Sequence, residues 1–313
     1  MAVRTSGADR GWDEAREDGR GLPRSQVGTT PQHLLMTLFG DYWSGHHEHL
    51  PSAALVDLLA EFDVTQASAR AALNRLTRRE LLQSTKLGRQ TYYGLAPHAL
   101  ELLQETARRI VAFGTQEVRS WDGSWTLVAF SVPEAQRRVR YAVRTRLRWL
   151  GFAALFDGLW CSPWDERDAA LAALSELGIA SATVMRAGID PRSTLQALDA
   201  WDLEEVREKY LEFEAEFTPI LDQARKGRLT ASRALVERTK VMDSWRSFLG
   251  DEPDLPAELL PGDWPRARMR ELFIDVYDSL APVAKGRCQQ VIAQHAPELA
   301  ELVTTHDAMD ARS

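Results

Sequence analysis

Residues 66–95 constrain the fold most, because the spacing of apolar side chains changes within them from a helical to a strand period. A helix from Gln66 to about Glu80 is predicted, since at 100° per residue one face collects four apolar side chains: Ala69, Ala72, Leu73 and Leu76. Two β-like segments follow at 81–85 and 90–95, and Gly88 between them can adopt the positive φ of a hairpin tip. Helix and hairpin together indicate a small mixed α+β domain.

Two further helices are expected before this segment and one after it. Pro31 suits the first turn of a helix, and apolar residues then recur at helical spacing as far as Tyr42. Ser52 is the expected N-cap of the second helix, and the last helix is expected from Pro97 to about Gly114. The order helix, helix, helix, hairpin, helix predicts a winged helix-turn-helix.

The predicted third helix and hairpin concentrate positive charge. Residues 65–90 contain six basic side chains and one acid, whereas the whole chain of 313 residues carries a formal net charge of −7. A local positive patch attracts a phosphate backbone whatever the total charge. We interpret the segment as a DNA-binding surface, and the alternative is a solvated amphipathic helix that happens to be basic.

Eight side chains are candidate DNA contacts. Arginine can bond guanine edges or phosphates and asparagine can pair with adenine, and Asn74 is the only asparagine in the chain. Hydroxyls at a helix N-terminus suit a phosphate, and basic side chains on a hairpin tip suit phosphates or the minor groove. The candidates are Thr65, Ser68, Arg70, Asn74, Arg75, Arg78, Lys86 and Arg89.

Residues 121–190 predict a second domain. A strand at Trp125–Val132 leads into a helix that Pro133 opens and Gly151 closes, and Asp157-Gly158 is a strong hairpin dipeptide. A helix at 165–177 and a strand at 179–185 complete the order β-α-β-β-α-β, which is that of a ferredoxin-like domain.

The predicted fold class is therefore α+β, with a helical domain at the C-terminal end. That last region is punctuated by prolines between 253 and 265. The expected segments are a disordered tail at 1–30, the winged helix-turn-helix at 31–118, the ferredoxin-like domain at 119–192, a helical domain for ligand binding or dimerisation at 193–305, and a tail at 306–313.

The helix at 133–150 is rich in arginine. Arg140, Arg144 and Arg148 share one face, and stacked guanidinium groups repel one another unless something acidic meets them. DNA, an anionic ligand and the acidic helix at 201–217 are all compatible with that face.

No motif for catalysis, a cofactor or a metal is found. G-x-S-x-G, the P-loop and G-x-G-x-x-G are absent, and the spacing of His46, His47 and His49 differs from H-E-x-x-H. We therefore expect no catalytic residue, no cofactor and no metal. Two lone thiols, Cys161 and Cys288, and the absence of an apolar run of about 18 residues favour a cytoplasmic protein without a membrane partner.

Three parts of the chain, in sequence order, resemble the PaaX family of repressors, over roughly residues 31–290. The predicted helix and hairpin carry SARAALNRL at 68–76 and GRQTYYGL at 88–95. The middle region carries WDGSW at 121–125, FSVPE at 130–134 and LWCSP at 159–163. The C-terminal region carries LPAELLPGDWP at 255–265.

The resemblance implies a repressor of a catabolic operon. In founding members it controls phenylacetate degradation, and phenylacetyl-CoA releases the repressor from DNA. The family's middle domain is similar to a small CRISPR-associated nuclease that needs an aspartate near the end of its first strand, and residues 126–132 hold no carboxylate. If an acyl-CoA binds, its phosphates need cations, for which the candidates are Arg140, Arg144 and Arg148, with Trp160 as an aromatic wall.

The leading hypothesis is thus a ligand-responsive repressor. It would bind a double-stranded DNA operator as a homodimer, with half-sites about 34 Å apart or a multiple of that. An acyl-CoA effector such as phenylacetyl-CoA would release it. The alternatives are a metal-dependent nuclease or acyl-CoA-processing enzyme that uses the ferredoxin-like domain, and a scaffold whose basic face binds an acidic protein.

Overall fold

The computed structural model describes residues 30–114, 120–190, 192, 195–252 and 255–305, so both predicted tails lie outside it apart from Thr30. The chain forms two compact units. The first combines the residues up to 115 with 211–249 and those from 266 onward, and the second combines 116–210 with 250–265. The N-terminal helices and most of the C-terminal helices therefore share one unit. The domain boundaries given above stay a prediction.

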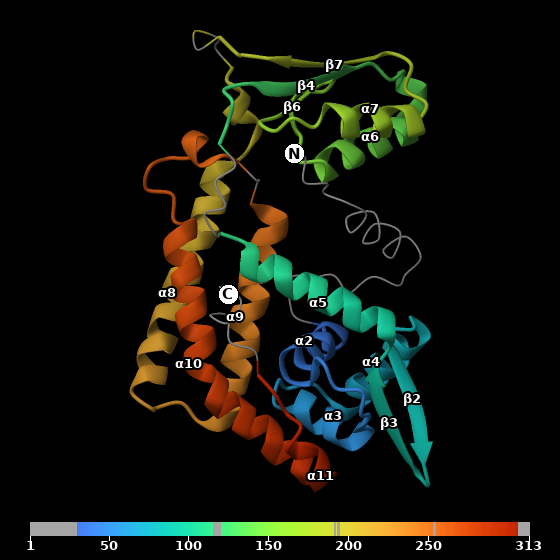
Figure 1. Ribbon diagram of the computed structural model, residues 1–313, viewed down its shortest axis with the longest axis vertical. Coiled ribbons are helices and arrows are strands. Elements are labelled where there is room, and N and C mark those ends of the chain that lie inside the picture. Colours follow the sequence, from blue (N-terminus) through green and yellow to red (C-terminus); the bar gives the residue numbers. More distant parts are fainter. Residues whose placement is uncertain (1–29, 115–119, 191, 193–194, 253–254, 306–313) are drawn as a thin grey trace. The chain divides into compact units, whose positions relative to one another are not determined.

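The N-terminal part of the first unit follows the predicted order of elements (Figure 1). A short strand before the second helix completes a three-stranded sheet of order β1-β3-β2. Leu35, Leu59 and Leu76, one from each of the first three helices, are fully buried in one core. The elements are α2 (Pro31–Trp43), β1 (Leu50–Pro51), α3 (Ser52–Ala60), α4 (Gln66–Arg78), β2 (Leu82–Leu87), β3 (Gln90–Leu95) and α5 (Pro97–Ala112).

The predicted N-cap of the second helix is wrong. Ser52 is the first helical residue of α3, and the N-cap position is held by Pro51, which makes no side-chain capping bond. Pro51 also belongs to β1, where it lies opposite Tyr92 of β3. Strand pairing thus keeps Pro51 extended, and the helix begins directly after it.

Helices from the C-terminal half complete the first unit. They are α8 (Leu203–Arg225), α9 (Ala231–Asp251), α10 (Arg266–Ala293) and α11 (Pro297–Ala300). The first residues of α8 and the last residues of α9 belong to the second unit. Trp245 of α9 is fully buried and stacks on Phe273 of α10 with ring centroids 5.2 Å apart. Its Nε1 donates to the carbonyl of Ile110 in α5 at 3.3 Å. This indole therefore joins the N-terminal helices to the C-terminal ones.

The apolar core of the N-terminal helices continues into the end of α10. Cys288 and Ile292 belong to the same buried cluster as Leu59 of α3. Two polar contacts flank that cluster: Arg287 donates to Glu61 at 2.6 Å, and His295 Nε2 lies 2.7 Å from Asp57 Oδ2. The C-terminal end of α10 is thus packed against α3.

Arg238 of α9 places a positive charge at the centre of the first unit. Its guanidinium is fully buried and lies 3.7 Å from the ring centroid of Tyr277 and 5.3 Å from that of Tyr42. Its Nη1 lies 3.5 Å from Oδ2 of Asp41 in α2, and the Tyr277 hydroxyl donates to Oδ1 of Asp41 at 3.0 Å. Burial raises the pKa of Asp41, and the charge of Arg238 opposes that rise. A buried ion pair therefore joins α2 to α9 and α10.

A second buried polar group also joins α2 to α9. Asp243 of α9 accepts a hydrogen bond from Thr37 Oγ1 at 3.1 Å and lies 3.0 Å from His33 Nε2, both on α2. Arg246, one helical turn further along α9, donates to Asp243 at 2.7 Å. Charged groups thus hold α2 against α9 at two levels.

The second unit holds a four-stranded antiparallel sheet of order β5-β6-β4-β7. One face packs Val128 and Trp160 against α6 and α7 (Figure 1), and the other packs Trp125 and Cys161 against Ala197. The elements are β4 (Trp125–Phe130), η1 (Glu134–Gln136), α6 (Arg137–Trp149), β5 (Ala153–Phe156), β6 (Leu159–Ser162), α7 (Arg167–Glu176), β7 (Ala182–Ala187), η2 (Ala197–Ala200) and η3 (Ala257–Leu259).

The last strand of this sheet begins later than predicted. Ile179 donates its N–H to the carbonyl of Leu174 at 2.9 Å, which closes the end of α7, and β7 therefore starts at Ala182.

Nowhere among the described residues is a helix both long and apolar enough to cross a membrane.

The buried ion pair yields a stability prediction. Replacing Arg238 by Met would leave the Asp41 carboxylate buried without its counter-charge, so we expect the free energy of unfolding to fall by about 3–5 kcal/mol. Urea denaturation of the full chain measures this. As a control, Arg225→Ala removes an exposed pair with Asp275 and should cost less than about 1 kcal/mol.

The double variant Asp41→Asn with Arg238→Met separates the ion pair from simple packing. Because it leaves no lone buried charge, it should recover part of the loss seen for Arg238→Met. Equal losses for Arg238→Met and Arg225→Ala would contradict the assignment.

Candidate nucleic-acid interface

The start of α4 is fixed by hydroxyl groups. Thr65 is the N-cap, and its Oγ1 accepts from the Ser68 N–H at 3.3 Å, as an N-cap residue should. The same Oγ1 donates to the Ser68 hydroxyl at 3.0 Å. Both side chains remain exposed. The two predicted phosphate contacts therefore lie together at the first turn of the helix.

The turn before α4 is tight and adopts an uncommon backbone conformation. Asp63 has a φ of 59°, in the left-handed region that aspartate tolerates better than most residues. The N–H of Val64 donates back to Leu59 of α3 at 3.2 Å. The loop from α3 to α4 is thus closed by hydrogen bonds, and it sets the direction in which α4 leaves.

The two faces of α4 divide as the sequence predicts. Ala69, Ala72, Leu73 and Leu76 are at most 2% exposed. The opposite face exposes four candidate DNA contacts. In the part of the chain that the structure describes, the side chains of these four form no ion pair and no hydrogen bond, so no partner among the described residues has to be displaced before they bind a ligand. They are Arg70, Asn74, Arg75 and Arg78.

The hairpin after α4 has a shorter tip than predicted. Leu87 pairs with Gln90, so only Gly88 and Arg89 lie in the turn, and Gly88 has a φ of +62°. A two-residue turn with a positive φ at its first position suits the twist of the strands, so pairing continues beyond the expected end at Thr85. Arg89 is therefore at the tip, whereas Lys86 lies within β2, and both are exposed.

His49, just before β1, contacts both strands of the hairpin. His49 Nδ1 lies 3.0 Å from Thr85 Oγ1, and its ring covers Gly94 so closely that a Cβ at that position would clash with it. Burial lowers the pKa of His49. In the sequence, the signal for this contact is a histidine just before a strand, together with a glycine in the strand on which it packs.

The described residues offer no constellation for metal catalysis. Among them, no group of three or more His, Cys, Asp or Glu side chains is close enough to hold a metal ion. His46 lies 3.9 Å from Glu48, while His49 lies 3.0 Å from Thr85, so these two histidines contact different groups. Strand β4 (Trp125–Phe130) carries no carboxylate.

The candidate effector residues lie on or beside α6. Arg140 donates to the Val132 carbonyl at 2.8 Å, and Arg144 lies 3.1 Å from Asp157. Arg148 lies 5.6 Å from the ring centroid of Trp160. Trp160 is 1% exposed, inside the core between sheet and helices. The structure thus brings Arg148 and Trp160 together, with the ring covered.

Two arginines of α6 form ion pairs inside their own unit. Arg144 pairs with Asp157 and Arg146 with Glu176, while Glu214 of the acidic helix α8 pairs with Arg268.

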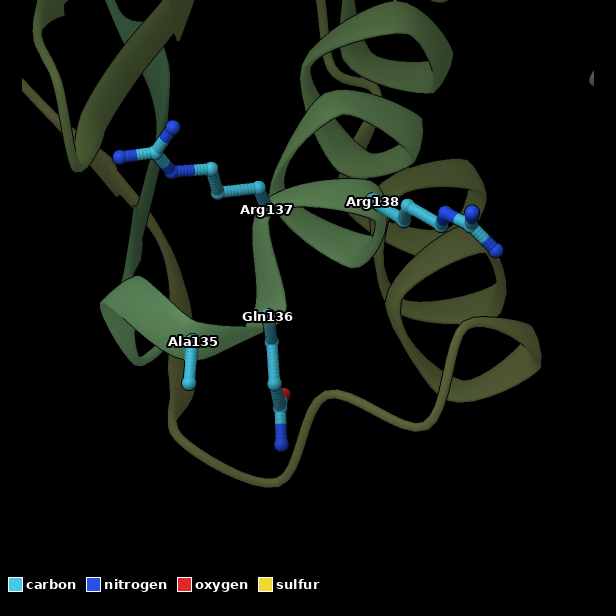
Figure 2. Close-up of a pocket in the computed structure, with 4 residues that line it drawn as sticks. All are labelled: Ala135, Gln136, Arg137 and Arg138. Carbon is cyan, nitrogen blue, oxygen red and sulfur yellow. The ribbon is translucent and has the colours of Figure 1, made fainter.

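A hollow lies at the start of α6, where Arg137 and Arg138 point to opposite sides (Figure 2). Ala135 and Gln136 complete its lining, so none of the predicted effector residues contributes to it.

Three family models match consecutive parts of the chain. Residues 30–99 match the model described as PaaX-like protein, and 118–198 match the PaaX protein central Cas2-like domain. Residues 201–290 match the PaaX-like protein C-terminal domain. The three matches together leave only short gaps between residues 30 and 290.

Two known proteins resemble most of the chain. The Transcriptional repressor PaaX of Escherichia coli strain K12 is 28% identical over 260 residues, which is 80% of each chain. The solved structure of the uncharacterized protein Rv0674 from Mycobacterium tuberculosis has a TM-score of 0.53 and 22% identity, covering 82% of this chain and 97% of that one. The second likeness concerns the fold alone. With three matching models in sequence order, the chain belongs to the PaaX family.

Proposed function

We propose that this protein is a transcriptional repressor that binds double-stranded DNA through α4 and the β2–β3 hairpin. The observation that carries the proposal is the exposed face of α4, where Arg70, Asn74, Arg75 and Arg78 have no side-chain partner among the described residues. Long cationic side chains exposed on one face of a rigid helix can bind a polyanion such as DNA. The Escherichia coli relative is named Transcriptional repressor PaaX, and this similarity supports the same function here.

In this proposal, residues 31–112 are a winged helix-turn-helix and 125–187 a ferredoxin-like domain. The order of elements supports the first assignment, with α3 and α4 as the helix pair and the β2–β3 hairpin as the wing. The strand order β5-β6-β4-β7 with two helices on one face supports the second.

Each part of the interface has its own role. Arg75 and Asn74 would contact base edges in the major groove, because guanidinium and carboxamide groups can bond guanine and adenine bidentately. Thr65, Ser68, Arg70 and Arg78 would contact phosphates around the helix, and Lys86 and Arg89 would contact phosphates beside the hairpin. Two such helices in a homodimer would contact two half-sites of an operator.

Truncation of the side chains proposed to contact base edges should weaken DNA binding. Arg75→Ala and Asn74→Ala should each weaken binding to the DNA upstream of the protein's own gene by about 1–3 kcal/mol, roughly fivefold to 150-fold. Fluorescence anisotropy with excess competitor DNA measures this. Arg108→Ala is the matched control, because Arg108 is an exposed arginine on α5 that pairs with Glu105, and its affinity should not change.

Unchanged operator affinity in both Asn74→Ala and Arg75→Ala would remove α4 from the interface. An absence of binding by the native chain at low salt and about micromolar concentration would contradict DNA binding altogether, since even non-specific binders associate there.

We further propose that an acyl-CoA such as phenylacetyl-CoA releases the protein from DNA and that Arg140, Arg144 and Arg148 contact its phosphates, with Trp160 beside them. The support is the density of arginine on α6 and the family resemblance. The Arg144–Asp157 pair is exposed on the aspartate side, so a phosphate could replace that carboxylate. Exposure of Trp160 would require α6 to move.

Phenylacetyl-CoA should therefore lower operator affinity in the anisotropy titration. Arg144→Ala should weaken this response at least fivefold and leave affinity without the thioester unchanged. Arg167→Ala is the control, because Arg167 is an exposed arginine of the same unit that pairs with Asp165. A native complex indifferent to the thioester would exclude this effector and leave the repressor function standing.

A further inference from the structure

Leu87 places an apolar side chain on the most basic part of the hairpin. It is 71% exposed, a value that among the described large apolar side chains only Tyr141 equals. Isolated exposed leucines are ordinary on protein surfaces, so exposure alone carries no argument. The position of Leu87 does, because Lys86 precedes it and Gly88-Arg89 follows it, and residues 81–95 contain no acid.

The structure of the hairpin makes Leu87 protrude. Side chains alternate along a strand, so Leu87 shares a face with Thr85 and with its cross-strand partner Gln90. The polar neighbours on that face have partners of their own: the Tyr92 hydroxyl donates to Gln90 Oε1 at 3.0 Å, and Thr85 Oγ1 lies 3.0 Å from Nδ1 of His49, which precedes β1. Leu87 is the last paired residue before a two-residue turn and packs against no buried cluster among the described residues.

We propose that Leu87 enters the minor groove of the bound DNA, between the phosphate contacts of Lys86 and Arg89; the inference rests on the proposed function. The sugar walls of the groove are apolar, and minor-groove proteins commonly insert an apolar wedge at a deformable base step. The two flanking cations match the phosphates on either side. Leu87 would then favour operators with a deformable step at the position of the hairpin.

The test is a comparison of salt dependences. The probe is the fragment upstream of the protein's own gene, titrated by anisotropy at several salt concentrations. Leu87→Ala should weaken binding about tenfold at every salt, because apolar burial is lost but no counterion contact is. Lys86→Ala should instead reduce the slope of log affinity against log salt by about 1. Leu171→Ala, which truncates a leucine 53% exposed on α7, should change neither quantity.

A second readout tests insertion itself. With 2-aminopurine placed through the protected region, the native protein should raise fluorescence at one step by unstacking it, and Leu87→Ala should not. Thermal unfolding of Leu87→Ala should match that of the native chain, since the side chain is exposed.

Three outcomes would overturn the inference. Native affinity in Leu87→Ala, with Arg75→Ala weakened, would refute the wedge and leave the proposed function intact. A change of salt slope in Leu87→Ala like that in Lys86→Ala would refute an apolar contact. Native affinity in both Leu87→Ala and Arg75→Ala would refute the proposed function together with the wedge.

Discussion

The ion pair between Asp41 and Arg238 is the interaction on which the rest of the first unit depends. Two charges are buried there, and burial of a charge is tolerated only when partners surround it. The hydroxyl of Tyr277 donates a hydrogen bond to Asp41, and the rings of Tyr42 and Tyr277 lie against the guanidinium of Arg238. A shift of α2 away from α9 would separate these groups, so the position of the first helix is fixed by helices from the other end of the chain.

This arrangement has a consequence for DNA binding. α2 and α3 both contact α4, so the direction of the exposed face of α4 follows from the position of α2. The C-terminal helices therefore serve as the support of the proposed interface rather than as a separate appendage. In a ligand-responsive repressor, a ligand that favours another arrangement of α9 or α10 would have to break the buried contacts of Asp41 and Asp243, which is a discrete change of state rather than a gradual one.

Much of the fold and of the proposed interface could be predicted from local patterns. The apolar stripe of α4 and its basic outer face are set by helical periodicity, and the elements of the second unit by periodicity with Gly151 and Asp157-Gly158. The misses depend on non-local contacts: Ser52 fails as an N-cap because Pro51 pairs with β3, and Lys86 lies within a strand because the turn has two residues. The contacts of Arg238 and Trp245 could not be predicted, because their partners lie on distant helices and no local pattern indicates them.

The central claim is that the exposed face of α4 lies in a DNA groove, and directed cleavage tests it most directly. Cys161 and Cys288 are buried, and burial raises the pKa of both thiols to about 12, so a cysteine introduced at the exposed Ala67 would be the reactive one. A DNA-cleaving iron chelate attached there should cut the upstream fragment at a few neighbouring positions within each half-site, and excess unlabelled operator should suppress the cuts. Uniform cleavage, or none above that of the free reagent while the labelled protein remains bound, would contradict the account.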